Sequence, residues 1–288
     1  MEYIIHLLIL ISIYSILSMS LNLIVGYAGL LSVTHAAFYG VGAYTTAILI
    51  SRYETNFFLT AIAGAIIAGL LALLFGLILK RFKADYYALV TFGLNIIVFS
   101  VFLNWQELTR GPLGIPGIDR PELFGFVFKE NIFFLVLVGL VAYAIYELIE
   151  YVVKSSFGRT LKALREDEVT TEVLGYKTEN YKMVTFSLSA ALAAIAGSFF
   201  ASYITFIDPS TFSLDESIFI LSLVILGGLA NSRGVFWGTV VLILLPEALR
   251  FVGFPTDIAA QMRQVVYGLL LVFLMMYRPR GFMGKYRL

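Results

Sequence analysis

Long uncharged apolar runs alternate with short polar segments along the whole chain. A helix needs about 20 apolar residues to cross a bilayer. Four runs reach that length without any Asp, Glu, Lys or Arg: residues 3–51, 55–79, 86–106 and 183–207. The first run is long enough for two crossings. The pattern therefore predicts an all-α, polytopic helical bundle in a membrane.

Basic residues gather in three segments, 80–83, 154–182 and 278–287, whereas the loops 107–130 and 208–216 are rich in acids. The positive-inside rule places the three basic segments in the cytoplasm and the two acidic loops outside. This assignment predicts an external N-terminus and nine crossings, within a range of about 8 to 10. The predicted crossings are residues 3–25, 30–50, 57–79, 85–105, 131–153, 183–206, 214–231, 234–252 and 260–277. The last three are short or interrupted by charges, so we expect half-helices or re-entrant segments among them.

The first residues lack the basic region and small-residue cleavage site of a signal peptide. We therefore expect the first span to stay in the mature protein.

The segment 154–182 is a charged island between two apolar spans. Ser155 or Ser156 can cap a helix there, and Gly175 can end it in the left-handed conformation, so we expect a single helix. Its apolar residues fall roughly on one side of that helix: Leu161, Leu164, Val169 and Val173. Such a helix can be a docking surface, a helix on the membrane surface, or a solvated linker.

Glycines and polar residues interrupt the apolar runs, most densely in residues 22–44. We expect this segment to depart from regular helix and to lie inside the bundle, either along a solute pathway or at close helix contacts. Small residues four apart, Ala190 with Ala194 and Ala193 with Gly197, also favour close contacts. Six polar side chains in apolar spans are candidates for the pathway, although hydrogen bonds between helices explain them equally well: Asn22, Ser32, Thr34, His35, Thr91 and Asn95.

Several kinds of chemistry find no residues in this sequence. There is no cysteine, and the two histidines have no acidic neighbours, so we expect no metal site, no catalytic set and no enzyme activity. A net charge of +1 gives no basic excess for nucleic acid. The first four spans and the sixth hold no carboxylate in their interiors, which argues against ion-coupled transport. The chain also lacks a P-loop, so an ATP-driven motor would have to be another subunit.

Five segments together resemble the LivM-type permease subunits of ABC importers for branched-chain amino acids. They are residues 20–44, 86–94, 109–117, 158–175 and the pair 227–229 with 246–250. The match covers most of the chain. It departs from the family pattern at Leu30, where a glutamine is usual, and at Val33 and Thr34, which replace a Leu-Gly pair before the histidine.

The resemblance implies one permease domain, residues 1–288, in the cytoplasmic membrane, with a coupling loop at about 154–182. Its implied partners are a second, related permease, two cytoplasmic ATP-binding subunits, an external solute-binding protein and membrane lipid. No cofactor is expected in this chain, because the partner subunits bind ATP. The residues implied in coupling are Gly158, Arg159, Leu161, Leu164, Arg165, Glu166, Asp167, Glu168 and Gly175. The implied substrates are leucine, isoleucine and valine. Alternatives are urea, amides or other small polar solutes, and a stand-alone channel or ion-coupled carrier.

Overall fold

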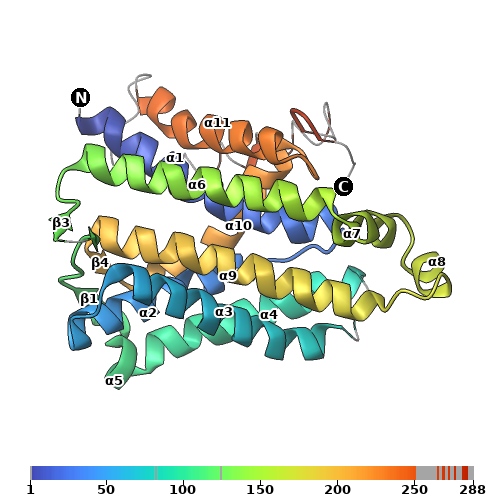
Figure 1. Ribbon diagram of the computed structural model, residues 1–288, viewed down its shortest axis with the longest axis horizontal. Helices are drawn as coiled ribbons and strands as arrows, with labels where there is room; N and C mark the ends of the chain where they lie inside the picture. The colour runs from blue at the N-terminus through green and yellow to red at the C-terminus, as the bar shows by residue number, and fades with distance from the viewer. Residues whose placement is uncertain are drawn as a thin grey trace.

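The computed structural model is a bundle of long helices (Figure 1). It describes residues 2–80, 82, 84–123 and 125–250, together with 265, 268, 269, 272, 276 and 281–284. The long helices are α1 (Glu2–Asn22), α2 (His35–Tyr53), α3 (Phe57–Leu79), α4 (Ala84–Asn104), α6 (Asn131–Lys154), α9 (Thr178–Ile204), α10 (Leu214–Gly227) and α11 (Ser232–Arg250). Shorter helices are the π-helix η1 (Leu23–Tyr27), α5 (Gln106–Thr109), α7 (Ser156–Glu166), α8 (Glu168–Val173), and the 3-10 helices η2 (Gly111–Leu113) and η3 (Pro209–Phe212). The strands are β1 (Ile115–Pro116), β2 (Glu122–Leu123), β3 (Phe126–Val127) and β4 (Phe206–Ile207).

Eight of the nine predicted crossings coincide with the long helices, which confirms the all-α bundle. The ninth, 260–277, lies almost entirely outside the described residues. Among the described residues, five helical stretches are long and apolar enough to cross a membrane: Glu2–Tyr27, Phe57–Leu79, Tyr86–Asn104, Asn131–Lys154 and Thr178–Ile204. α10 has only 14 residues, about 21 Å of helix. It is shorter than the roughly 30 Å hydrocarbon layer, as expected for a half-helix.

The two ends of the bundle differ, and their contents agree with the predicted orientation. α9 runs through the middle of the bundle, with α2 and α3 on one side and α1 and α6 on the other (Figure 1). At one end lie the N-terminus and the strands, where β1 pairs antiparallel with β4. At the opposite end lie α7 and α8. Lys80 at the end of α3 forms a 3.1 Å salt bridge with Glu179 of α9, which joins the basic turn after α3 to the island.

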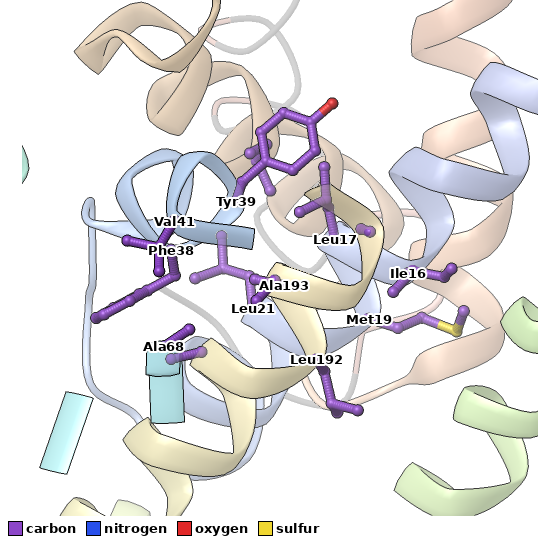
Figure 2. Close-up of a cluster of buried hydrophobic side chains, with 14 of the residues drawn as sticks. Ile16, Leu17, Met19, Leu21, Phe38, Tyr39, Val41, Ala68, Leu192 and Ala193 are labelled. Carbon is purple, nitrogen blue, oxygen red and sulfur yellow. The ribbon is translucent and has the colours of Figure 1, made fainter. Parts of the chain in front are cut away.

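The core forms where α1, α2, α3 and α9 meet. Figure 2 shows buried side chains of one hydrophobic cluster that come from these four helices, among them Ile16, Leu17, Leu21, Phe38, Tyr39, Ala68, Leu192 and Ala193. All of these residues are buried. This buried core holds α1, α2 and α3 against α9, although the helices also present apolar faces outward. The same helices position the polar groups described below.

Glycine allows α2 and α9 to approach with their backbones in contact. A Cβ on Gly42 would lie 2.0 Å from the carbonyl oxygen of Ala194, and one on Gly197 would lie 2.0 Å from that of Tyr39. The predicted close contact at Gly197 is therefore confirmed. Because both obstacles are backbone atoms, a side chain cannot be accommodated by a rotamer change.

Replacing Gly42 with alanine is expected to destabilise the bundle, because α2 and α9 must separate and lose buried contacts. Overpacking of this kind costs about 1–3 kcal/mol. Thermal unfolding of the detergent-solubilised protein should show a Tm several degrees below that of the parent. Gly93→Ala is the matched control, since a Cβ on Gly93 meets nothing within 4 Å. Equal Tm values for the two variants would contradict the proposed close contact.

Candidate translocation pathway and coupling site

The first membrane helix does not continue into the second as regular helix. After Asn22 the chain forms the π-helix η1 and then runs without helix to Thr34, before α2 begins at His35. The predicted departure from regular helix is thus confirmed for residues 23–34, whereas residues 35–44 are regular α-helix. All of η1 is buried. Irregular backbone at membrane depth is tolerated only inside protein or beside a water-filled cavity.

Asn22 holds the end of α1 against the turn between α10 and α11. Its Oδ1 accepts a 3.0 Å hydrogen bond from the backbone N–H of Ala230. Ala230 has a φ of +57°, a left-handed conformation that is uncommon without glycine. The Nδ2 atom of Asn22 is buried and has no hydrogen-bond partner within the described part of the chain. Asn22 therefore braces two irregular segments.

The other predicted pathway residues lie around the start of α2. The Ser32 and Thr34 hydroxyls are 3.1 Å apart, and the Thr91 hydroxyl of α4 accepts a 3.3 Å hydrogen bond from Val33 N–H. His35 Nε2 lies 2.7 Å from the hydroxyl of Ser20 in α1. These groups are buried, so the irregular segment is held by side chains from both α1 and α4.

Asn95 belongs to the same region but contacts α10. Its Nδ2 donates to the Ser217 hydroxyl at 3.1 Å, and that hydroxyl also accepts from Ala36 N–H at 3.0 Å. The prediction missed Ser20 and Ser217. Both are polar residues in apolar helices, so the criterion that selected the six candidates would have found them.

The charged island is two helices rather than the single helix expected. Ser155 is the N-cap of α7, with its hydroxyl accepting from Gly158 N–H at 3.4 Å, as predicted. Asp167 is extended and breaks the helix, and its carboxylate accepts from Thr170 N–H at 3.1 Å to cap α8. Hydrogen bonds from the Thr170 hydroxyl and backbone lower the pKa of the Asp167 carboxyl. Gly175, with a φ of +89°, closes α8 in the predicted left-handed conformation.

Most of the island's predicted coupling residues hold its own structure. A Cβ on Gly158 would lie 2.2 Å from the Val153 carbonyl oxygen, so this glycine lets α7 approach the end of α6. Leu161 and Leu164 are buried. Glu168 forms a salt bridge with Lys182 of α9, whose side chain is only 3% exposed. Arg159 and Glu166 are exposed.

Arg165 joins the island to the irregular segment. Its guanidinium donates to the carbonyl oxygen of Val25 at 3.1 Å and to that of Gly26. Gly29, at a φ of +71°, lies directly beside the Arg165 side chain, where a Cβ would be 2.7 Å from Cγ. Charge-assisted bonds of this kind are stronger than neutral ones. Arg165 therefore connects α7 directly to η1.

α8 carries the exposed apolar surface of the island. Val169, Val173 and Leu174 are 69%, 81% and 70% exposed. The expectation that Leu161, Leu164, Val169 and Val173 share one side is therefore wrong. The break at Asp167 turns the two leucines inward and the two valines outward. Exposed apolar groups at the end of the bundle carrying the basic segments are suited to a protein partner.

Within the described residues no three His, Cys, Asp or Glu side chains are grouped to hold a metal ion. The buried, irregular segment is connected through Arg165 to an island with an exposed apolar surface, an arrangement typical of a membrane transport subunit.

Comparison with known proteins gives the family. A family model described as branched-chain amino acid transport system / permease component matches residues 3–275. The chain belongs to this family. It is 32% identical to the high-affinity branched-chain amino acid transport system permease protein LivM of Escherichia coli K12, covering 96% of this chain and 68% of that protein. The probable LivM of Methanocaldococcus jannaschii is 25% identical over 93% of this chain and 89% of its own length. LivH of Escherichia coli K12 is 25% identical over 95% of this chain and 92% of its own length. No solved structure matches the chain.

Proposed function

We propose that this permease is the membrane-spanning subunit of an ABC importer that moves leucine, isoleucine and valine across the cytoplasmic membrane. Transport occurs by alternating access, and partner subunits hydrolyse the ATP. The whole chain forms one permease domain, with its coupling loop at residues 154–182. The permease has no cofactor and no catalytic role of its own.

The observation that carries the proposal is the bond between Arg165 and the carbonyl oxygens of Val25 and Gly26. It connects a surface able to bind a cytoplasmic motor with the buried segment that contains the candidate pathway residues. A channel or an ion-coupled carrier is not driven by a cytoplasmic motor and does not require such a connection. The names of the relatives support the substrate class, since LivM and LivH are both described as permeases for branched-chain amino acids.

The proposed partners follow from the same reasoning. Two cytoplasmic ATP-binding subunits supply the energy, with one docked on α8 of this chain. A second permease completes the pathway, and the similarity of this chain to both LivM and LivH supports a related rather than identical partner. A solute-binding protein delivers the amino acid to the end that carries β1 and β4.

Replacing Val173 and Leu174 with aspartate is expected to block docking of the ATP-binding subunit. Both side chains are largely exposed in the permease, so the charges do not disturb its core. Burying them against an apolar groove of the partner would leave unpaired charges, which is strongly unfavourable. Copurification of the ATP-binding subunit and uptake of labelled leucine should both fall at least tenfold.

Asn180→Asp is the control, because it adds one such negative charge at an exposed position near α8 without an apolar contact to lose. Its copurification and uptake should resemble those of the parent. Uptake of leucine by the permease in liposomes without ATP or partners would contradict the proposed function and favour a stand-alone carrier.

A further inference from the structure

A groove of about 650 Å³ lies between α1, α6 and α11, on the side of α9 that carries α1 and α6 (Figure 1). Its wall on α6 includes Ala142 and Lys154, which are about 18 Å apart along the helix at 1.5 Å per residue. Half of a bilayer with its headgroups is about 20 Å thick. Lys154 is at the end of the bundle that carries α7. The groove therefore extends across about one leaflet, the cytoplasmic one.

Charged side chains from two helices line this groove. Glu150 of α6 accepts a 3.0 Å hydrogen bond from the Ser232 hydroxyl and forms a 3.1 Å salt bridge with Lys154. This carboxylate is therefore paired within the protein. The charged lining residues are Glu147, Glu150, Lys154 and Arg233.

Glu147 and Arg233 are the charges of the groove without an ionic partner among the described residues. Arg233 Nε donates to the Tyr146 hydroxyl at 3.1 Å, which is a neutral partner. Both charged side chains are exposed, and they come from two different walls of the groove, α6 and α11. Glu147 lies about 10 Å before Lys154 along α6, at the depth where headgroups meet acyl chains. A charge at this depth is unfavourable unless an opposite charge is bound.

Small and apolar side chains form much of the remaining groove. Those on α1 and α6 include Ser12, Met19 and Ala142. The Ser12 hydroxyl donates to the carbonyl oxygen of Leu8 within its own helix, so it needs no outside partner. The α11 wall carries Phe236 and Trp237, which are exposed. An acyl chain placed in this part would bury apolar surface.

Charge complementarity selects the occupant of the groove. A purely anionic headgroup would be repelled by Glu147 and Glu150, and a purely cationic one by Arg233 and Lys154. Phosphoethanolamine carries both a phosphate and a primary ammonium, which match Arg233 and Glu147. A choline headgroup has no N–H donor for a carboxylate. Residues 264–277 contain no Lys or Arg, so that segment has no cation for Glu147.

We propose that this groove binds a phospholipid with a phosphoethanolamine headgroup from the cytoplasmic leaflet. The phosphate accepts from the guanidinium of Arg233. The ammonium donates to the carboxylate of Glu147 and to the Tyr143 hydroxyl beside it. One acyl chain lies against Phe236 and Trp237, so the lipid joins α6 to α11. This site goes beyond the proposed transport function and does not rest on it.

Photo-crosslinking in vesicles tests the site. The purified permease complex is placed in phosphatidylcholine vesicles with a small amount of phosphatidylethanolamine that carries a diazirine in one acyl chain. Labelled peptides of α6 and α11 are quantified by mass spectrometry. Unlabelled phosphatidylethanolamine should reduce their labelling severalfold, whereas phosphatidylglycerol and soluble glycerophosphoethanolamine should not. The exposed face of α3, with Ile62, Ile66 and Leu70, is the internal control, because lipids should label it without headgroup preference.

Two variants separate the two ends of the headgroup. With probes of either headgroup, Glu147→Gln should remove the preference for ethanolamine over choline while labelling remains. Arg233→Gln should reduce labelling by both probes severalfold, because both carry the phosphate. Glu130→Gln neutralises an exposed acid at the other end of α6, and Arg52→Gln an exposed arginine outside the groove. Both controls should behave as the parent does.

Three results would overturn the proposal. The first is equal displacement of the probe by phosphatidylcholine and phosphatidylethanolamine in the parent. The second is an unchanged headgroup preference in Glu147→Gln, or an equal loss of labelling by both probes there, which would give Glu147 a structural role only. The third uses benzoylphenylalanine in place of Phe236, which should crosslink to lipid. Crosslinks to a second permease or to residues 251–280 instead would show that protein fills the groove.

Discussion

Alanine in place of Arg165 is expected to abolish uptake while the permease still inserts and binds its ATP-binding subunit. The guanidinium bonds to Val25 and Gly26 would be lost, and each hydrogen bond from a charged donor contributes about 1.5–3 kcal/mol. Closure of the motor would then move α7 without moving η1. Leucine uptake by reconstituted importers should fall more than tenfold, with ATP hydrolysis retained.

Arg165→Lys tests whether the paired contact matters, because a lysine ammonium lacks the planar fork that reaches two acceptors at once. An intermediate uptake rate is expected. Arg52→Ala is the matched control, since Arg52 is an exposed arginine outside the island that also donates to two backbone carbonyl oxygens, those of Glu107 and Leu108. Normal uptake by Arg165→Ala would show that the island does not act through this contact.

Local signals in the sequence were sufficient to predict where the helical part of the island begins and ends, but not that it is divided into two helices. The Ser155 cap and the left-handed Gly175 were predicted because each depends on its nearest neighbours. The break at Asp167 also has a local signal, because its carboxylate is an acceptor placed three residues before Thr170. This signal was overlooked because Asp167 lies among other charged residues and was interpreted as part of one charged cluster. The partners of Arg165 lie about 140 residues away in the chain, and no local pattern identifies them.

The polar residues in apolar spans show a similar division. Their burial was predictable, because an unpaired polar group facing lipid is costly. Their partners were not, since Thr91 contacts Val33 and Asn95 contacts Ser217 only after the helices pack. Asp215 was expected in an outward-facing acidic loop. In the structure Asp215 is exposed in the first turn of α10.

Gly26 is the residue of η1 whose replacement should be most damaging. A Cβ there would lie 1.9 Å from Asn22 Oδ1 and 2.6 Å from the backbone nitrogen of Ala230. These two atoms form the hydrogen bond that braces the end of α1 against the turn before α11. A π-helical turn in a membrane helix is frequently a functional feature. The carbonyl oxygen of Gly26 also accepts a hydrogen bond from Arg165, so the Asn22–Ala230 hydrogen bond and the Arg165 contact both depend on Gly26.

Gly26→Ala is therefore expected to break the Asn22 brace and displace the carbonyl that Arg165 holds. A buried hydrogen bond lost without replacement costs about 1–3 kcal/mol, and the clash adds to it. The Tm of the purified permease should fall by several degrees, and uptake should fall more than tenfold even below the new Tm. Gly139→Ala is the control, because a Cβ on Gly139 meets nothing within 4 Å. If the Tm falls but uptake is normal at low temperature, Gly26 contributes to stability alone. If uptake is still lost when a ligand or partner subunit restores the Tm, Gly26 takes part in the transmission from α7 to the pathway.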